Sequence, residues 1–300
     1  MKQIAGDVEL KISRLLPSGE GVGDLELKEV RVRNALPGEK VRARILKKRK
    51  GVRYADGLLL ENPASIRQKS PCDYFPRCGG CSMLHLSESA EIVLKEGKLS
   101  SDLSLNDVSF EQTQRAVSSN RLGYRRKARL GVKCLGESIL VGFRESYSSR
   151  VARIEHCKIL TVRLSDLIVG LKRVISSCSV KEKIPQIEVA EGDSGIAIIV
   201  RHLVPLSDPD IDQWAEFSES ENVAVFFQAK GYDSLVRLKS KILSEKLSYS
   251  LEEYGVTLDF RPELFTQVNS AINLELIRTA LCFFGDLQGT TILDFFSGIG

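Results

Sequence analysis

Three cysteines lie close together in one short stretch of this 300-residue chain. Cys72, Cys78 and Cys81 are separated by five and then two residues, and a Gly-Gly pair stands between the last two. Because glycine lets the backbone turn tightly, the three thiolates can converge on one centre. A four-cysteine site needs one more ligand, and Cys157 is the best candidate. The spacing therefore predicts a metal or cluster site.

Two kinds of centre compete for such a site. Zinc usually takes paired cysteine hooks, whereas this sequence offers one hook, a longer gap and a remote cysteine. That pattern favours a [4Fe–4S] cluster, and spacing alone leaves zinc as the alternative. The chain has seven cysteines, an odd number, which argues against a complete disulfide framework. We expect Cys134, Cys178 and Cys282 to be small buried hydrophobic residues.

Positive charge is concentrated in two stretches. Between Lys40 and Arg53 there are eight basic residues and no acidic one, and between Arg121 and Lys133 there are six and again no acidic one. The net charge is only +4, so the remainder of the chain is acidic. Phosphate neutralisation supplies much of non-specific nucleic-acid affinity, so these stretches favour a polyanionic partner. The alternative is a pair of solvent-exposed charged surfaces.

The segments that must position these residues begin with short strands. Up to about residue 63, apolar and polar residues alternate, with turns at 17–19 and 36–39. Several short strands in so few residues predict a small β-barrel like those of oligonucleotide-binding modules. A helix is predicted after the cysteines, capped by Ser87 or Ser89.

The middle of the chain has a mixed pattern. Between about 121 and 260, strands are predicted at 128–132, 139–143, 196–200 and 223–227, and a helix at 164–175. No apolar run approaches the roughly 18 residues that span a bilayer, and the charged start rules out a secretory segment. We expect a cytoplasmic protein.

The last part of the chain changes character. A polar-aromatic stretch at 265–269 precedes a helix with apolar positions from Leu274 to Phe284, and a strand is predicted at 291–294. That strand ends in an acidic residue and runs into a Gly-x-Gly turn, as the first crossover of a doubly wound sheet does. On its own, such a turn also fits other nucleotide-binding folds or a simple loop.

Taken together, several separate stretches point to one family. The chain resembles RumA-type class I RNA (uracil-5-)-methyltransferases, which modify 23S ribosomal RNA. The matching stretches occur in the family's order and cover essentially the whole chain. They are Pro71–Leu86, Tyr124–Gly131, Gly142–Arg144, Ile154–Leu160, Phe265–Asn269 and Leu293–Gly300.

The resemblance implies a multidomain α/β protein in three parts. An RNA-binding TRAM (OB-like) β-barrel is expected at 1–64, and a central mixed α/β iron–sulfur domain at 65–86 and 117–260. The start of a Rossmann-like methyltransferase domain is expected at 87–116 and 261–300. The implied partner is RNA, specifically 23S rRNA. No membrane association is expected, and the protein is expected to be a monomer.

The resemblance also assigns roles to individual residues. Cys72, Cys78, Cys81 and Cys157 match the family's [4Fe–4S] ligands. Gln267 and Phe296 match contacts to S-adenosyl-L-methionine, and Asp294, Gly298 and Gly300 lie in the same motif. The expected RNA contacts are Lys47, Lys48, Arg49, Lys50, Arg125, Arg126 and Lys127.

Family mechanism requires a cysteine nucleophile. Its thiolate adds to C6 of uracil so that C5 can attack the methyl sulfonium; a glutamate base then removes the C5 proton, and the thiolate leaves C6. In the family both residues lie C-terminal to the Gly-x-Gly turn, and no cysteine here sits in the nucleophile's motif. We therefore expect no catalytic residue in this chain, an incomplete S-adenosylmethionine site and no methylation by the chain alone. The alternative is a non-catalytic iron–sulfur RNA-binding module from a truncated or split gene.

Overall fold

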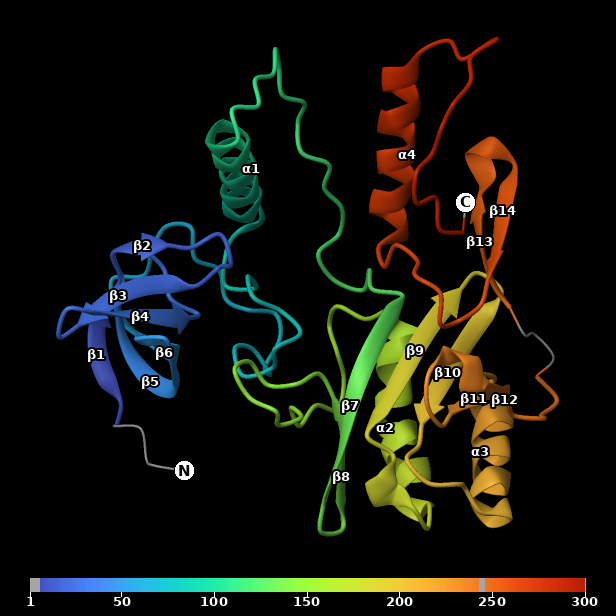
Figure 1. Cartoon of the computed structure of the whole chain (residues 1–300). Coiled ribbons are helices and arrows are strands. Elements are labelled where there is room, and N and C mark those ends of the chain that lie inside the picture. The colour runs from blue at the N-terminus through green and yellow to red at the C-terminus, as the bar shows by residue number, and fades with distance from the viewer. Residues whose placement is uncertain (1–5, 243–245, 300) are drawn as a thin grey trace. The chain divides into compact units, whose positions relative to one another are not determined.

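The computed structural model describes residues 6–242 and 246–299, so the Gly300 prediction lies outside the described residues. The chain divides into two compact units. The first comprises Met1–Ala116 and Arg144–Ala152, and the second comprises Val117–Phe143 and Arg153–Gly300. Each unit contains its own six-stranded sheet (Figure 1). The division into three domains stays a prediction.

The first unit is built on a sheet with the strand order β1-β5-β6-β4-β3-β2. The strands are β1 (Val8–Lys11), β2 (Arg14–Leu15), β3 (Gly21–Leu25), β4 (Lys28–Arg33), β5 (Lys40–Arg49) and β6 (Val52–Glu61). β1 pairs with β5 at one edge, and β2 pairs with β3 at the other. Because β1 and β2 are almost consecutive in the chain, one continuous segment carries both edges of the sheet.

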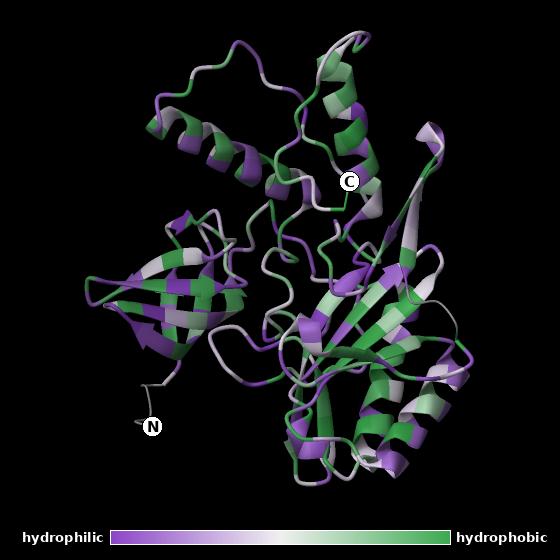
Figure 2. Cartoon of the chain, turned by 45° about the vertical axis from the view of Figure 1, so that its right-hand side comes forward, coloured by the Kyte–Doolittle hydropathy of each residue, from purple (hydrophilic) through white to green (hydrophobic). Residues whose placement is uncertain are grey.

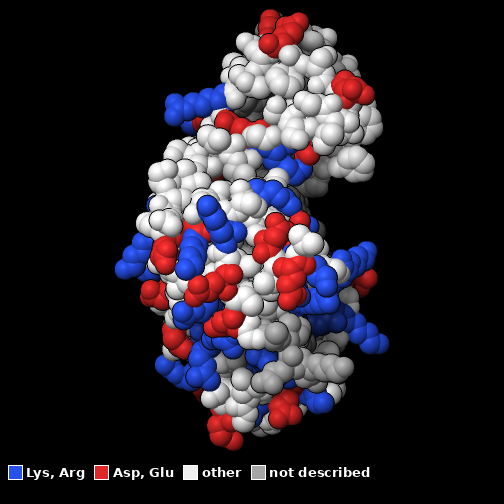
Figure 3. All heavy atoms as spheres, turned by 90° about the vertical axis from the view of Figure 1, so that its left-hand side faces the viewer, with Lys and Arg blue, Asp and Glu red and all other residues white. Residues whose placement is uncertain are grey.

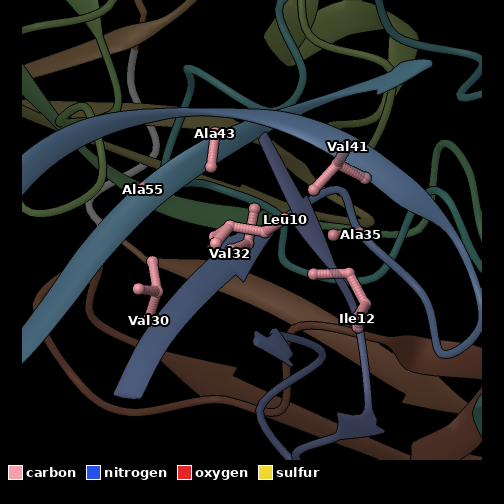
Figure 4. Packing of buried hydrophobic residues seen from close by; sticks show 8 residues of the cluster. All are labelled: Leu10, Ile12, Val30, Val32, Ala35, Val41, Ala43 and Ala55. Atoms are coloured by element: carbon pink, nitrogen blue, oxygen red, sulfur yellow. The ribbon is translucent and has the colours of Figure 1, made fainter. Parts of the chain in front are cut away.

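The core of this sheet follows from the alternation seen in the sequence. Side chains from β1, β4, β5 and β6 point to one cluster, shown in Figure 4. The buried members are Leu10, Ile12, Val30, Val32, Ala35, Val41, Ala43 and Ala55. Successive strand residues face opposite sides, so these apolar positions leave the intervening charged ones outside. The predicted strands and the turns at 17–19 and 36–39 are confirmed.

One buried ion pair joins this sheet to the segment that follows it. The Glu39 carboxylate is fully buried and accepts hydrogen bonds from the backbone N–H of Leu36 and of Ala64. Arg67 donates to both carboxylate oxygens, with Nη2 at 2.6 Å from Oε2. Burial alone would raise the pKa of Glu39, but these donors outweigh it and hold that pKa below its ordinary value.

We expect Glu39→Gln to lower the free energy of unfolding by about 3 kcal/mol, because Arg67 keeps a desolvated charge without its partner. Since the folded-state pKa is depressed, the stabilising contribution is present at neutral pH. It is lost as the pH falls below the ordinary value of 4.5 and through the folded-state value. Urea unfolding at several pH values measures both effects. The control is Glu61→Gln, which removes an exposed carboxylate and should change the free energy of unfolding by less than about 1 kcal/mol.

The second unit is built on a mixed sheet with the strand order β12-β11-β10-β9-β7-β8. The strands are β7 (Lys127–Leu135), β8 (Ser138–Gly142), β9 (Gln186–Gly192), β10 (Gly195–Arg201), β11 (Ala224–Gln228) and β12 (Leu235–Arg237). Only β10 and β11 run parallel among these neighbours, and α3 (Asp208–Glu221) supplies the crossover that a parallel pair needs. The predictions of β7, β8, β10 and β11 are confirmed.

The two faces of this sheet are covered differently. α2 (Val162–Ser177) and α3 pack together, and Trp214 of α3 contacts the Phe227 ring of β11. The opposite face holds an apolar cluster that includes Phe226 and residues of a hairpin formed by β13 (Leu247–Leu251) and β14 (Val256–Phe260). Figure 2 shows hydrophobic residues along the strands and along α2. The predicted helix at 164–175 is confirmed, whereas α3 and the hairpin were not anticipated.

Two further helices have no buried residue. α1 (Glu88–Leu105) begins after Ser87, whose side chain accepts a hydrogen bond from the Ala90 N–H, so the predicted cap is confirmed. α4 (Ser270–Phe284) begins after Asn269, whose side chain accepts from the Ile272 N–H. In the described residues no helix is long and apolar enough to cross a membrane.

Three predictions from the sequence were wrong. Residues 291–294 form no strand, because a strand needs a hydrogen-bonded neighbour and none of the described strands pairs with them. Cys282 is exposed on α4 rather than buried, and Cys134 is only half-buried. Cys178 is buried as expected, and burial raises the pKa of its thiol to about 11.

Candidate functional site

A pocket of about 650 Å³ lies in the second unit. Five separate parts of the chain line it: the residue before β7, the end of β9 with the turn that follows, the β13–β14 hairpin, the segment that leads into α4 with the start of that helix, and residues 296–299. The lining residues are Arg126, Glu191, Asp193, Tyr249, Ser250, Leu251, Phe260, Leu264, Phe265, Thr266, Gln267, Ser270, Ala271, Asn273, Leu274, Phe296, Ser297, Gly298 and Ile299. The pocket thus combines aromatic rings with polar and acidic side chains.

The pocket brings together two motifs that lie far apart in sequence. Gln267 and Thr266 come from the polar-aromatic stretch, while Phe296 and Gly298 come from the terminal turn. Both turn residues have positive φ, at 66° and 69°, a conformation that glycine adopts without strain and other residues rarely do. Ile299 packs against the apolar cluster on the sheet, which holds the turn beside the pocket.

The predicted cofactor residues divide into two groups. Gln267, Phe296 and Gly298 line the pocket, and the side chains of Gln267 and Phe296 are exposed to it and to solvent. Asp294 is exposed and is not part of the lining. The structure therefore gathers three of the five predicted residues in one place.

Backbone hydrogen bonds fix the wall beside Gln267. The Arg126 N–H donates to the Val268 carbonyl at 2.9 Å, and the Arg126 carbonyl accepts from the Glu191 N–H at 2.8 Å. Asn269 then caps α4 and also donates from its side chain to Ser119 Oγ at 3.0 Å. The polar-aromatic stretch is consequently held in place at the edge of the sheet.

Two acidic side chains line the pocket, and each lies beside an arginine. Glu191 accepts a hydrogen bond from the Thr161 hydroxyl and lies 3.8 Å from Arg163. Asp193 pairs with Arg126, whose Nη1 lies 2.7 Å from Oδ1. The lining therefore holds two carboxylates and one guanidinium, and the charge of Asp193 is offset by Arg126.

Sequence reasoning missed the residues that the β9–β10 turn and the hairpin contribute. Asp193 accepts from the Ser250 N–H at 2.8 Å, and its own N–H donates to the Ser248 carbonyl at 2.7 Å. Neither Asp193 nor Tyr249 belongs to a recognisable motif, and more than fifty residues separate them. A Gly-Asp-Ser-Gly turn signal was the single local hint.

The cysteine loop lies in the first unit. Cys78 is buried, while Cys72 and Cys81 are half-buried. The Cys78 N–H donates to the Tyr74 carbonyl at 2.8 Å. A Cβ on Gly79 would lie 2.6 Å from the Arg144 carbonyl oxygen, so only glycine fits there.

The fourth predicted ligand lies in the other unit. Cys157 is half-buried, and its N–H donates to Ser165 Oγ in α2 at 2.9 Å. Within residues 6–242 and 246–299, no three Cys, His, Asp or Glu side chains are gathered as metal ligands. The donor chemistry of three thiols on one loop suits an iron–sulfur cluster, and the cluster itself stays a prediction.

The first predicted RNA-binding segment forms the end of the β5–β6 hairpin. Lys47, Lys48, Arg49 and Lys50 are all exposed, and none forms an ion pair with another described residue. Lys50 and Gly51 both have positive φ, as a two-residue hairpin turn requires. At the other end of β5, Lys40 forms ion pairs with Glu9 and Glu61. Figure 3 shows acidic side chains among basic ones on this side of the molecule.

The second predicted RNA-binding segment makes contacts within its own unit. The Arg125 guanidinium carbon lies 5.7 Å from the centre of the Phe143 ring, and Arg126 pairs with Asp193. The Lys127 ammonium donates to the Leu264 carbonyl. Burial lowers the pKa of Lys127, with Glu188 acting in the opposite direction. Arg126 and Lys127 therefore contact residues of the pocket wall, which the sequence did not reveal.

Comparison with solved structures defines the class of fold. The mixed α/β fold is similar to that of the Pyrococcus abyssi tRNA (uracil-54, C5)-methyltransferase in complex with S-adenosyl-L-homocysteine. The TM-score is 0.62 at 20% identity, and the match covers 90% of this chain and 64% of that one. The chain therefore has the fold of an RNA (uracil-C5)-methyltransferase.

Comparison with curated proteins is more specific. The relatives are named 23S rRNA (uracil(1939)-C(5))-methyltransferase RlmD, and no family model matches the chain. The protein from Hahella chejuensis is 38% identical over 298 residues, which are 98% of this chain and 66% of that protein. The proteins from Alkalilimnicola ehrlichii and Acinetobacter baumannii strain AYE are 36% and 35% identical, and the chain covers 66% and 60% of them. The chain is a homologue of the 23S rRNA (uracil-C5)-methyltransferases and spans about two thirds of their length.

Proposed function

We propose that this chain provides the RNA-binding and S-adenosylmethionine-binding parts of a methyltransferase that acts on C5 of a uridine in 23S rRNA. The observation that carries the proposal is the pocket, where Gln267 and Thr266 face the same space as Phe296 and Gly298. Homology over 98% of the chain supports the same assignment.

The chemistry of the pocket suits S-adenosylmethionine. An adenosyl group needs apolar and aromatic surface, which Phe265, Phe296 and Tyr249 offer. A sulfonium and an ammonium are positive, and the carboxylate of Glu191, which lines the pocket, carries the opposite charge. Gln267 can both donate and accept hydrogen bonds to a polar ligand. In this proposal, the pocket residues Gln267 and Phe296 and the terminal segment belong to the start of a Rossmann-like methyltransferase domain.

The first unit supplies the RNA-binding part of the proposal. We assign its sheet to a TRAM-type β-barrel, since one segment carries both edges and a single core fills the interior. The exposed end of the β5–β6 hairpin gives four positive charges for phosphate contact.

Four cysteines hold a [4Fe–4S] cluster in the same proposal. Cys72, Cys78 and Cys81 supply three thiolates from one loop, and Cys157 supplies the fourth. The thiol donor set and the tight turn at Gly79 support this assignment.

Titration with S-adenosylhomocysteine tests the ligand assignment. We expect the chain to bind it, and we expect Gln267→Ala and Phe296→Ala each to weaken binding by about 10-fold, because each removes a direct contact worth about 1.4 kcal/mol. Isothermal titration calorimetry measures the change. Gln288→Ala, outside the lining, is the control and should leave affinity unchanged. Equal affinity in all four proteins would exclude this pocket as the site.

A further inference from the structure

One ion pair connects three separate parts of the pocket wall. Arg126 Nη1 lies 2.7 Å from Asp193 Oδ1, and both side chains are partly exposed, at 27% and 40%. The second carboxylate oxygen of Asp193 accepts from the Ser250 N–H at 2.8 Å. The pair therefore links the start of β7, the β9–β10 turn and the β13 strand.

The contacts around the pair show that the hairpin rests on the β9–β10 turn. The Asp193 N–H donates to the Ser248 carbonyl at 2.7 Å, and Ser248 N–H donates to Ser194 Oγ at 2.9 Å. A Cβ on Gly192 would lie 2.5 Å from the Ser248 carbonyl oxygen. This approach leaves no room for any other residue at 192.

The other end of the pair is fixed by backbone bonds. The Arg126 N–H donates to the Val268 carbonyl, and the Arg126 carbonyl accepts from the Glu191 N–H in β9. Val268 follows directly after Gln267, which lines the pocket. A shift of Arg126 would therefore move the polar-aromatic stretch, and a shift of Asp193 would move Tyr249 and Ser250.

We propose that the Arg126–Asp193 ion pair is a positioning device that sets the distance between the β13 side of the pocket and the Gln267 side. Arg126, which the sequence suggested as a phosphate contact, then acts on the pocket ligand through Asp193 and not on RNA. The inference rests on the proposed function for the identity of the ligand, and its geometry stands independently of that function.

A double-mutant cycle tests the pair. The variants are Arg126→Gln, Asp193→Asn and the two combined, because asparagine keeps an oxygen for the Ser250 N–H while losing the charge. We expect each single change to weaken binding of S-adenosylhomocysteine by about 5-fold, and the double change to cost no more than either single one. Arg126→Lys keeps the charge and should recover part of the affinity. The matched control is Arg129→Gln, which breaks the 2.9 Å pair between Arg129 of β7 and Glu188 of β9, both outside the pocket lining.

Two further measurements distinguish positioning from RNA contact. Hydrogen exchange at the Ser250 amide should accelerate in Arg126→Gln, whereas RNA affinity at fixed salt should stay unchanged. The opposite result, with weaker RNA binding, unchanged Ser250 exchange and unchanged ligand affinity, would overturn the proposal. If the unmodified chain binds no S-adenosylhomocysteine, the proposed ligand fails. Faster Ser250 exchange would still support the positioning role, and unchanged exchange would refute it.

Discussion

Cys78→Ser is expected to remove most of the bound iron and the broad visible absorbance from anaerobically purified protein. Iron–sulfur clusters are held by thiolates, and a serine hydroxyl is a much poorer ligand for iron. Cys78 is the most buried of the three loop cysteines, so solvent offers little replacement. Iron and acid-labile sulfide analysis, together with the absorption spectrum, measures the loss.

Two cysteine variants make this test specific. Cys282→Ser changes an exposed thiol on α4 and should leave iron content and spectrum unchanged. Cys157→Ser should behave like Cys78→Ser if the remote cysteine is the fourth ligand. Unchanged iron in Cys78→Ser would refute the ligand assignment, and stoichiometric zinc in the unmodified protein would establish the alternative metal.

Elements with a strong local pattern were predictable from the sequence. The strands that hold Val30, Val41 and Ala43 alternate apolar and charged residues around these positions, and α1 has a serine cap directly before it. The prediction of a strand at 291–294 was wrong, although the local pattern was present. Its apolar residues satisfy the pattern, but a strand forms only where a neighbour supplies hydrogen bonds.

The candidate site was only partly predictable. The family resemblance predicted Gln267 and Phe296 as cofactor contacts, and both line one pocket in the structure. Asp193 and Ser250 reach that pocket only through the pairing of a turn with a distant hairpin, which no local pattern encodes. The sequence around a basic residue also does not show whether its side chain forms an ion pair. Arg126 pairs with a carboxylate 67 positions away, while Lys48 faces solvent.

That difference between the two basic segments leads to the largest expected effect on RNA binding. Replacing Lys47, Lys48, Arg49 and Lys50 with glutamine should weaken binding of a single-stranded 23S rRNA fragment by about 100-fold near 0.1 M salt. Each phosphate contact with single-stranded nucleic acid contributes about 0.7 to the slope of log affinity against log salt. Losing four contacts should therefore reduce that slope by about 3. Fluorescence anisotropy titrations at several salt concentrations measure both values.

The control must remove equal charge from elsewhere. Lys95, Lys98, Lys239 and Lys241 are exposed and lie on α1 and after β12, so their replacement by glutamine changes net charge by the same amount. If the hairpin end contacts phosphate, the control protein keeps most of its affinity and its salt slope. Equal losses in the two proteins would mean that net charge alone drives binding. Unchanged affinity after the hairpin replacement would remove the β5–β6 hairpin from the RNA surface.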